Sequence, residues 1–163
     1  MYYKNNPLNL ILNIGIILYK FVNGKLYILF NQNIDMTYDL IYVKNINDNI
    51  DDNIKNRIYD ATNYLIQLEE IESINDLYDD TTFSLIKFIK LPEKYYDLKS
   101  THFNYYEVIT DDKKIKRELK WIEFKYSNNL IKRLKNKDII NNLNKIYKKY
   151  ILNSTLNKIK LYK

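Results

Sequence analysis

The sequence contains two apolar, β-branched runs separated by a two-residue turn signal. The runs cover Leu10–Phe21 and Lys25–Asn31, and they are joined by Val22-Asn23-Gly24-Lys25. Asn followed by Gly favours the left-handed backbone conformation that a tight turn between antiparallel strands requires. We therefore predict a β-hairpin, and with it a sheet against which the rest of the chain must pack.

The segment after this hairpin joins a strand-like stretch, Tyr38–Lys44, through a link rich in Asn and Asp to a helix-like stretch, Asn53–Tyr64. It resembles the Nudix hydrolase family. That family has an aromatic-Asp-Leu-Pro-Gly-Gly-Lys strand end, which leads into the pattern G-x5-E-x7-R-E-U-x-E-E-x-G-U, with U a bulky aliphatic residue. Asp39, Leu40 and Lys44 agree with the strand end.

Most chemical positions of the family pattern carry other residues here. With the terminal glycine of the pattern set at Asn63, the first glycine falls on Tyr42, the first glutamate on Asp48 and the arginine on Asn56. The three glutamates of the helix fall on Arg57, Asp60 and Ala61. One shortened carboxylate thus remains where the family has three.

This replacement has a direct chemical consequence. Cleavage of a nucleoside diphosphate derivative requires Mg²⁺ to neutralise phosphate oxygens and orient water, and Mg²⁺ requires carboxylate oxygens. Arg57 carries a permanent positive charge that repels the ion. The resemblance therefore implies a Nudix-like fold with an inactive site, with no catalytic residue, metal or cofactor.

The order of the other segments agrees with the resemblance. Thr82–Leu91 and His102–Thr110 are strand-like, and Lys120–Phe124 predicts a short strand. A helix is predicted from about Asn128 to Tyr150, from apolar residues at helical spacing: Leu130, Ile131, Leu134, Ile139, Ile140, Leu143, Ile146 and Tyr147. We expect one α/β (α+β) domain over residues 1–163, a Nudix-like α/β/α sandwich with a mixed sheet, a motif helix and a C-terminal helix. Its core covers about residues 8–151, and residues 152–163 form a basic tail.

Composition limits the class of protein. The 163 residues, 46% of them hydrophobic, provide enough apolar surface for one core. The chain has no cysteine, which excludes disulfides and thiolate metal sites. The N-terminal apolar run is interrupted by Asn9 and Asn13 and predicts a strand, so we expect a cytoplasmic (intracellular) protein without a membrane partner. The bias toward Asn, Ile, Lys and Tyr is typical of an AT-rich genome, such as that of an intracellular parasite or a large DNA virus.

Charge is divided unevenly along the chain. Residues 113–163 contain sixteen Lys or Arg and three acids, which gives a net charge of +13. Because the whole chain carries +6, the first 112 residues carry −7. A basic segment of this kind is typical of a phosphate-rich partner, although an AT-rich genome also places Lys on solvated faces. The candidate nucleic-acid-binding residues are Lys132, Arg133, Lys135, Lys137, Lys145, Lys148 and Lys149.

Other residues have structural explanations as well as functional ones. Phe103 and Tyr105 are candidate pocket aromatics, although aromatics on strands more often belong to a core. We interpret His102 as a strand residue and Trp121 as a packing residue. The acidic stretch Glu69–Asp80 is expected to be a solvated loop.

Three classes of function follow. The first is a catalytically inactive Nudix-fold protein that associates with RNA or a ribonucleoprotein particle such as a ribosome, with protein partners as a further expectation. The second is a divergent hydrolase of a dinucleoside polyphosphate or capped RNA, in which Asp48, Asp60 and Glu107 hold a metal. The third is a protein-only scaffold component of a complex or virion.

Overall fold

The computed structural model describes residues 2–3, 6–32, 38–46, 49–97, 102–110, 113–124 and 137–161. Strands, two α-helices and one short 3-10 helix alternate along the chain. In chain order the elements are β1 (Tyr2–Tyr3), β2 (Asn6–Leu10), β3 (Asn13–Val22), β4 (Lys25–Gln32), β5 (Tyr38–Asp39), β6 (Ile41–Lys44), α1 (Ile50–Ala61), β7 (Ser73–Asp79), β8 (Ser84–Lys90), η1 (Glu93–Tyr95), β9 (His102–Thr110), β10 (Lys113–Glu123) and α2 (Lys137–Leu161).

The predicted hairpin is confirmed as β3 and β4. Their antiparallel register pairs Val22 with Lys25, and Asn23 and Gly24 between them have φ values of 53° and 76°. Two successive positive φ values match the right-handed twist of the paired strands, which explains the Asn-Gly sequence. The hairpin therefore fixes the centre of the sheet.

The main sheet is mixed, with the strand order β7-β8-β3-β4-β10-β9. Strand β3 pairs in parallel with β8 along one edge. Along its other edge, the residues from Asn13 to Ile16 pair with β6 and those from Tyr19 to Val22 pair with β4. The strand end that precedes α1 is thus anchored next to the centre of the sheet.

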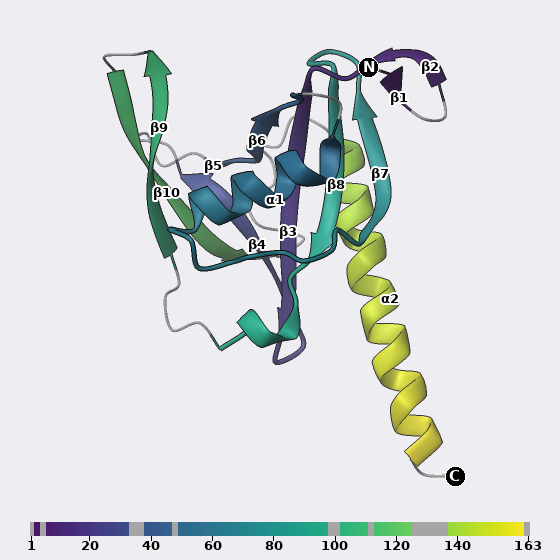
Figure 1. Ribbon diagram of the computed structural model, residues 1–163. Helices are drawn as coiled ribbons and strands as arrows, with labels where there is room; N and C mark the ends of the chain where they lie inside the picture. The colour runs from purple at the N-terminus through teal and green to yellow at the C-terminus, as the bar shows by residue number, and fades with distance from the viewer. Residues whose placement is uncertain are drawn as a thin grey trace.

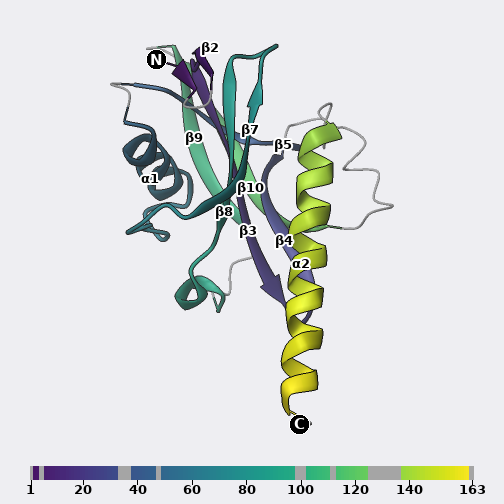
Figure 2. The same cartoon turned by 90° about the vertical axis from the view of Figure 1, so that its right-hand side faces the viewer.

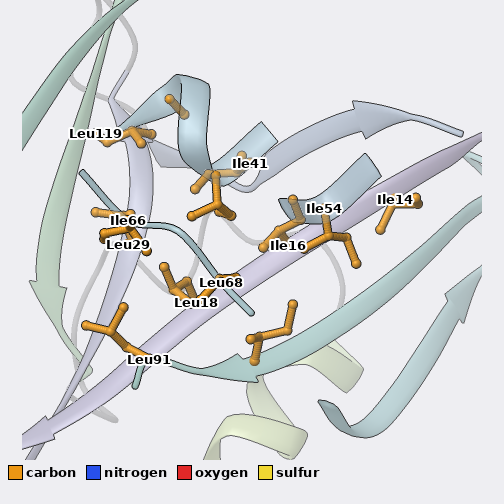
Figure 3. Close-up of a cluster of buried hydrophobic side chains, with 13 residues drawn as sticks. Ile14, Ile16, Leu18, Leu29, Ile41, Ile54, Ile66, Leu68, Leu91 and Leu119 are labelled. Carbon is orange, nitrogen blue, oxygen red and sulfur yellow. The ribbon is translucent and has the colours of Figure 1, made fainter. Parts of the chain in front are cut away.

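The helices cover opposite faces of this sheet (Figures 1 and 2). The first core cluster lies under α1 and includes Ile54, Ile58 and Ala61 (Figure 3). The second core cluster lies under α2 and includes Ile139 and Leu143. Adjacent strand residues alternate between the two clusters, because successive side chains of a strand point to opposite faces. The prediction of an α+β fold with a mixed sheet and two covering helices is confirmed.

Several boundaries differ from the sequence-based expectations. The prediction that the acidic stretch Glu69–Asp80 is a solvated loop is wrong, because residues 73–79 form β7 at one end of the sheet order. Strand β10 is longer than the predicted Lys120–Phe124 segment. Helix α2 continues past Tyr150 to Leu161, so that residues 152–161 are helical and do not form a tail. The predicted start of this helix, near Asn128, lies outside the described residues.

Candidate functional site

Helix α1, at the place of the expected motif helix, is held by its own caps and by one buried stripe. The Asn49 side chain accepts a hydrogen bond from the backbone N–H of Asp52 at 3.2 Å, which satisfies a free amide at the start of α1. Ile54, Ile58 and Ala61 are fully buried at spacings of four and three residues. This stripe turns the other side of α1 toward solvent.

The end of α1 is fixed by a buried hydroxyl. Thr62 Oγ1 donates to the carbonyl of Ile58 at 2.7 Å and accepts from the backbone N–H of Ile66 at 3.1 Å. Asn63 and Tyr64 then both adopt positive φ, 55° and 64°. Asn tolerates this conformation at a helix end, where many helices have glycine, whereas for a bulky Tyr it is strained.

The degenerate motif positions do not form a group of carboxylates. Asn56 and Asp60 are exposed on α1, Arg57 is half-buried, and Ala61 is fully buried in the first core cluster. Asp48 lies outside the described residues. In the described part of the chain, no three His, Cys, Asp or Glu side chains lie close enough to hold a metal ion. The side chains seen on α1 therefore do not fit Mg²⁺, which prefers oxygen ligands in a near-octahedral arrangement.

Tyr42 lies on β6, at the position of the first family glycine, and is 40% exposed. Partial burial raises the pKa of its hydroxyl, and the negative charges of Asp79 and Asp39 raise it further. The pKa of Asp79 is itself lowered, mainly because the Thr81 hydroxyl donates a hydrogen bond to its carboxylate. The carboxylates of Asp79 and Asp39 near Tyr42 repel a phosphate group, whereas the protonated Tyr42 hydroxyl remains a hydrogen-bond donor.

An open pocket of about 360 Å³ lies beside the loop that follows α1. It is lined by four glutamates, two lysines and three other residues: Gln67, Glu69, Glu70, Glu72, Lys90, Leu91, Pro92, Glu93 and Lys94. Lys94 pairs with Glu69 at 3.3 Å, and the Tyr95 hydroxyl donates to the carbonyl of Gln67 at 2.8 Å. We refer to it as the acidic pocket.

Helix α2 separates apolar and basic side chains. Its face toward the sheet carries Ile139, Leu143 and Ile146, each at most 4% exposed. The basic residues Lys137, Lys145, Lys148 and Lys149 are all exposed. At 3.6 residues per turn these four lysines share the side of α2 that points away from the sheet. We call them the basic ridge; the other three candidates, Lys132, Arg133 and Lys135, lie outside the described residues.

A buried lysine is the residue that sequence reasoning missed. Lys20 on β3 is 9% exposed, and its ammonium lies 4.2 Å from the centre of the Trp121 ring. Burial lowers the pKa of Lys20. A single Lys inside the apolar run from Ile14 to Phe21 was the available signal. Trp121 itself packs against the first core cluster, as its interpretation as a packing residue requires.

The aromatic candidates of β9 are placed only by their backbone. Phe103 and Tyr105 pair with Leu119 and Arg117 of β10, while their side chains, like those of His102 and Glu107, lie outside the described part. They therefore remain predictions.

Comparison with protein-family models and with curated proteins finds no match. No helix within the described ranges has both the length and the apolar character needed to cross a bilayer.

Proposed function

We propose that this protein is a catalytically inactive, Nudix-like binding protein that associates with RNA or with a ribonucleoprotein particle such as a ribosome. The observation that carries the proposal is the basic ridge. Its four lysines are exposed on one side of a helix whose opposite side is fixed to the sheet. From Ile139 to Lys163 the sequence has six lysines and no acid, and Asp138, next to Lys137, is the one carboxylate of α2.

The ridge suits a phosphate backbone better than a small ligand. The ridge runs over twelve residue steps from Lys137 to Lys149, a length of roughly 18 Å at 1.5 Å per residue, with eight of these steps between Lys137 and Lys145. Successive phosphates along a nucleic-acid strand can contact such a row, and each contact releases counterions. Specificity for RNA over DNA is part of the proposal and follows from the cytoplasmic expectation.

The motif helix supports the inactive part of the proposal. Asn63 adopts positive φ at the position where the Nudix pattern has glycine, which suits a retained Nudix-like backbone. Ala61, at the position of a metal-binding glutamate, is fully buried among Ile54 and Ile58. A Nudix-like backbone that keeps α1 but buries the residue at a metal-ligand position suits a protein that binds a partner without catalysis.

The test is retention of RNA by the purified full chain. A triple Glu substitution at Lys145, Lys148 and Lys149 should weaken binding of a single-stranded RNA and lower the slope of log K against log salt by about 2, at about 0.7 per phosphate contact. The matched control carries Glu at Lys25, Lys44 and Lys90, which are exposed elsewhere and give the same change in net charge. Equal loss in the two variants, or no loss in the first, would contradict the proposal.

A second assay separates the proposal from the hydrolase alternative. The protein is incubated with nucleoside diphosphate derivatives, dinucleoside polyphosphates and capped RNA, in Mg²⁺ or Mn²⁺. We expect no turnover. Turnover that disappears in Asp60→Asn would instead favour the divergent hydrolase. Absence of both turnover and RNA binding would favour the scaffold.

A further inference from the structure

The last part of α2 extends beyond the sheet (Figures 1 and 2). Tyr150 stacks on Phe21 of β3, with ring centroids 3.9 Å apart and an angle of 7° between the planes. Residues 151–161 continue the helix, over a length of about 16 Å at 1.5 Å per residue. We call this segment the overhang. Its side chains from Ile151 to Ile159 are exposed, apart from the half-buried Ser154, so they add little to the core of the domain.

Aliphatic and polar residues occupy opposite sides of the overhang. Successive residues of an α-helix are about 100° apart around its axis. On this spacing one side of the overhang carries five residues, which we call the outer stripe: Ile151, Leu152, Thr155, Leu156 and Ile159. The four aliphatic side chains among them are between 44% and 58% exposed. The Thr155 hydroxyl donates to the carbonyl of Ile151 at 3.0 Å, so the helix itself satisfies the one polar side chain of the stripe.

The outer stripe points away from the sheet. Ile139, Leu143 and Ile146 belong to the core cluster between α2 and the sheet. Asn153 and Asn157 continue their side of the helix, and the outer stripe lies roughly half a turn from it. None of the described strands or helices lies on the outer side of α2 (Figures 1 and 2). As far as the described elements go, this side of the helix is open to a flat surface.

Lysines lie beside the outer stripe. Lys148 and Lys149 are exposed on the same side of α2, about one turn before the stripe, and exposed Lys158 lies at its border. The sequence has no acid after Asp138. The apolar stem of a lysine can lie along a hydrocarbon layer while its ammonium reaches a charged or aqueous layer. The outer side of α2 thus combines an aliphatic centre with positive charge at its edges.

This combination selects among the possible partners. RNA would neutralise the lysines, but its phosphates offer the outer stripe no apolar contact. Two overhangs packed together would bring the lysines of both copies close and would bury few side chains, far from the roughly 1,200–2,000 Å² of a stable interface. An anionic bilayer meets both requirements, because its headgroups are negative and its acyl layer is apolar. A flat bilayer also contacts a single side of a helix, and both features lie on one side here.

We propose that the overhang docks on the surface of an anionic lipid bilayer. The outer stripe enters the boundary between headgroups and acyl chains, and Lys148, Lys149 and Lys158 contact anionic headgroups. Each lysine close to such a surface strengthens binding about fivefold, and the aliphatic side chains add to this without spanning the bilayer. The proposal differs from the expectation of no membrane partner, which rested on the N-terminal apolar run alone. It does not rest on the proposed function, because it requires no RNA.

The first test is sedimentation of the nuclease-treated full chain with vesicles. One set contains phosphatidylcholine with about three parts in ten of phosphatidylserine, and the other contains phosphatidylcholine alone. We expect binding to the anionic set only, and weaker binding as salt is raised, because salt screens the lysines. An absence of sedimentation with anionic vesicles at about 1 mM lipid would overturn the proposal, and so would equal sedimentation with both sets.

A matched pair of double variants tests the outer stripe. One carries Leu152→Gln and Leu156→Gln, and the other carries Asn153→Gln and Asn157→Gln on the opposite side of the overhang. All four changes keep the net charge, and Gln sustains a helix well. The leucine pair should weaken vesicle binding at least about tenfold, since two aliphatic side chains are lost from the apolar layer, whereas the asparagine pair should match the wild type. Thermal melts check that both variants stay folded, and equal vesicle binding by the two folded variants would contradict the proposal.

A fluorescent probe can locate the contact, because the chain has no cysteine. Leu156→Cys and Asn157→Cys are each labelled with the same polarity-sensitive dye. With anionic vesicles, the emission of the dye at position 156 should shift to the blue as the dye enters the apolar layer. The dye at position 157, on the opposite side of the helix, should shift much less. Equal shifts at the two positions would mean that the outer stripe is not the side in contact, and the proposal would be wrong.

RNA retention by the same variants separates this proposal from the proposed function. The leucine pair should retain single-stranded RNA as well as the wild type does, because the basic ridge is unchanged. An equal loss of RNA and vesicle binding in the leucine pair would assign the outer stripe to a ribonucleoprotein contact and overturn the proposal. A dimer that forms without vesicle binding would assign the stripe to a second copy and overturn it too. Failure with vesicles leaves the RNA proposal standing, and failure with RNA leaves the lipid proposal standing.

Discussion

Replacing Ala61 by Glu introduces the carboxylate that the Nudix pattern would have at this position and tests whether the local structure can accept it. Ala61 is 0% exposed and lies in the first core cluster on the inner side of α1. In a metal-binding site this side chain would have to reach a hydrated ion. Here it would enter an apolar core, and we expect the protein to be destabilised without gaining Mg²⁺ affinity.

The magnitude has two parts. Forcing a larger side chain into a packed core costs about 1–3 kcal/mol. Burial raises the pKa of the introduced carboxyl in the folded protein, and each unit costs about 1.4 kcal/mol at pH values above the raised pKa. A rise of about three units gives about 4 kcal/mol, so the sum approaches the total stability of a marginal domain, about 5–15 kcal/mol.

The control is Ala61→Gln, which adds nearly the same volume without the charge. Urea unfolding at pH 8 should place the Glu variant about 1–3 kcal/mol below the Gln variant, because a buried neutral amide also costs about 1–3 kcal/mol of the roughly 4 kcal/mol. The penalty belongs to the ionised carboxyl, whose folded pKa is raised. It is therefore complete at high pH and shrinks as the pH falls toward the unfolded value near 4.3. Equal stability of the two variants at pH 8, or stabilisation of the Glu variant by Mg²⁺, would refute the reasoning.

Three further substitutions test the sheet and the helix end. Gly15→Ala should cost about 1–2 kcal/mol in urea unfolding, because an added Cβ would lie 2.6 Å from Cδ1 of Ile86 in the core. Lys20→Met should raise stability by about 1 kcal/mol at pH 7, since a cation–π contact with Trp121 offsets only part of the cost of burying an ammonium. Because burial lowers the folded pKa of Lys20, this gain should shrink as the pH rises toward 10.5. Thr62→Val should cost about 2 kcal/mol, since it leaves a buried backbone N–H without its hydroxyl acceptor; an unchanged midpoint would contradict this account of the helix end.

The elements that the sequence identified are those with a local cause. Asn23 and Gly24 specify their turn by backbone conformation alone, so the β3–β4 hairpin could be predicted from adjacent residues. The motif helix was expected over Asn53–Tyr64 from the Nudix resemblance, and a helix, α1, is present at Ile50–Ala61 with its Asn49 cap directly before it. In both cases the physical cause lies within a dozen residues.

The missed elements depend on contacts between distant residues. Strand β7 contains Asp76 and Asp79 and has little strand propensity, but it pairs with β8, and the Asp76 carboxylate lies 3.2 Å from the Lys87 ammonium of that strand. Neither the pairing with β8 nor the ion pair with Lys87 can be predicted from the residues of the acidic stretch alone. The acidic pocket likewise joins the loop after α1 to the segment around Glu93, more than twenty residues away. Tertiary pairing outweighed local propensity at both places.

The end of α2 shows why a periodicity rule stops too early. The rule follows one stripe, and the stripe that packs on the sheet ends at Tyr150, because Asn153 and Asn157 occupy its next positions. Helical propensity does not end there: the following residues contain no Gly or Pro, and Leu, Ile and Lys sustain a helix well. The helix therefore outlasts its core stripe, and Leu152, Leu156 and Ile159 form a second, exposed stripe on its other side. A rule that follows one stripe cannot detect this continuation, because the change of side coincides with the end of the sheet contact.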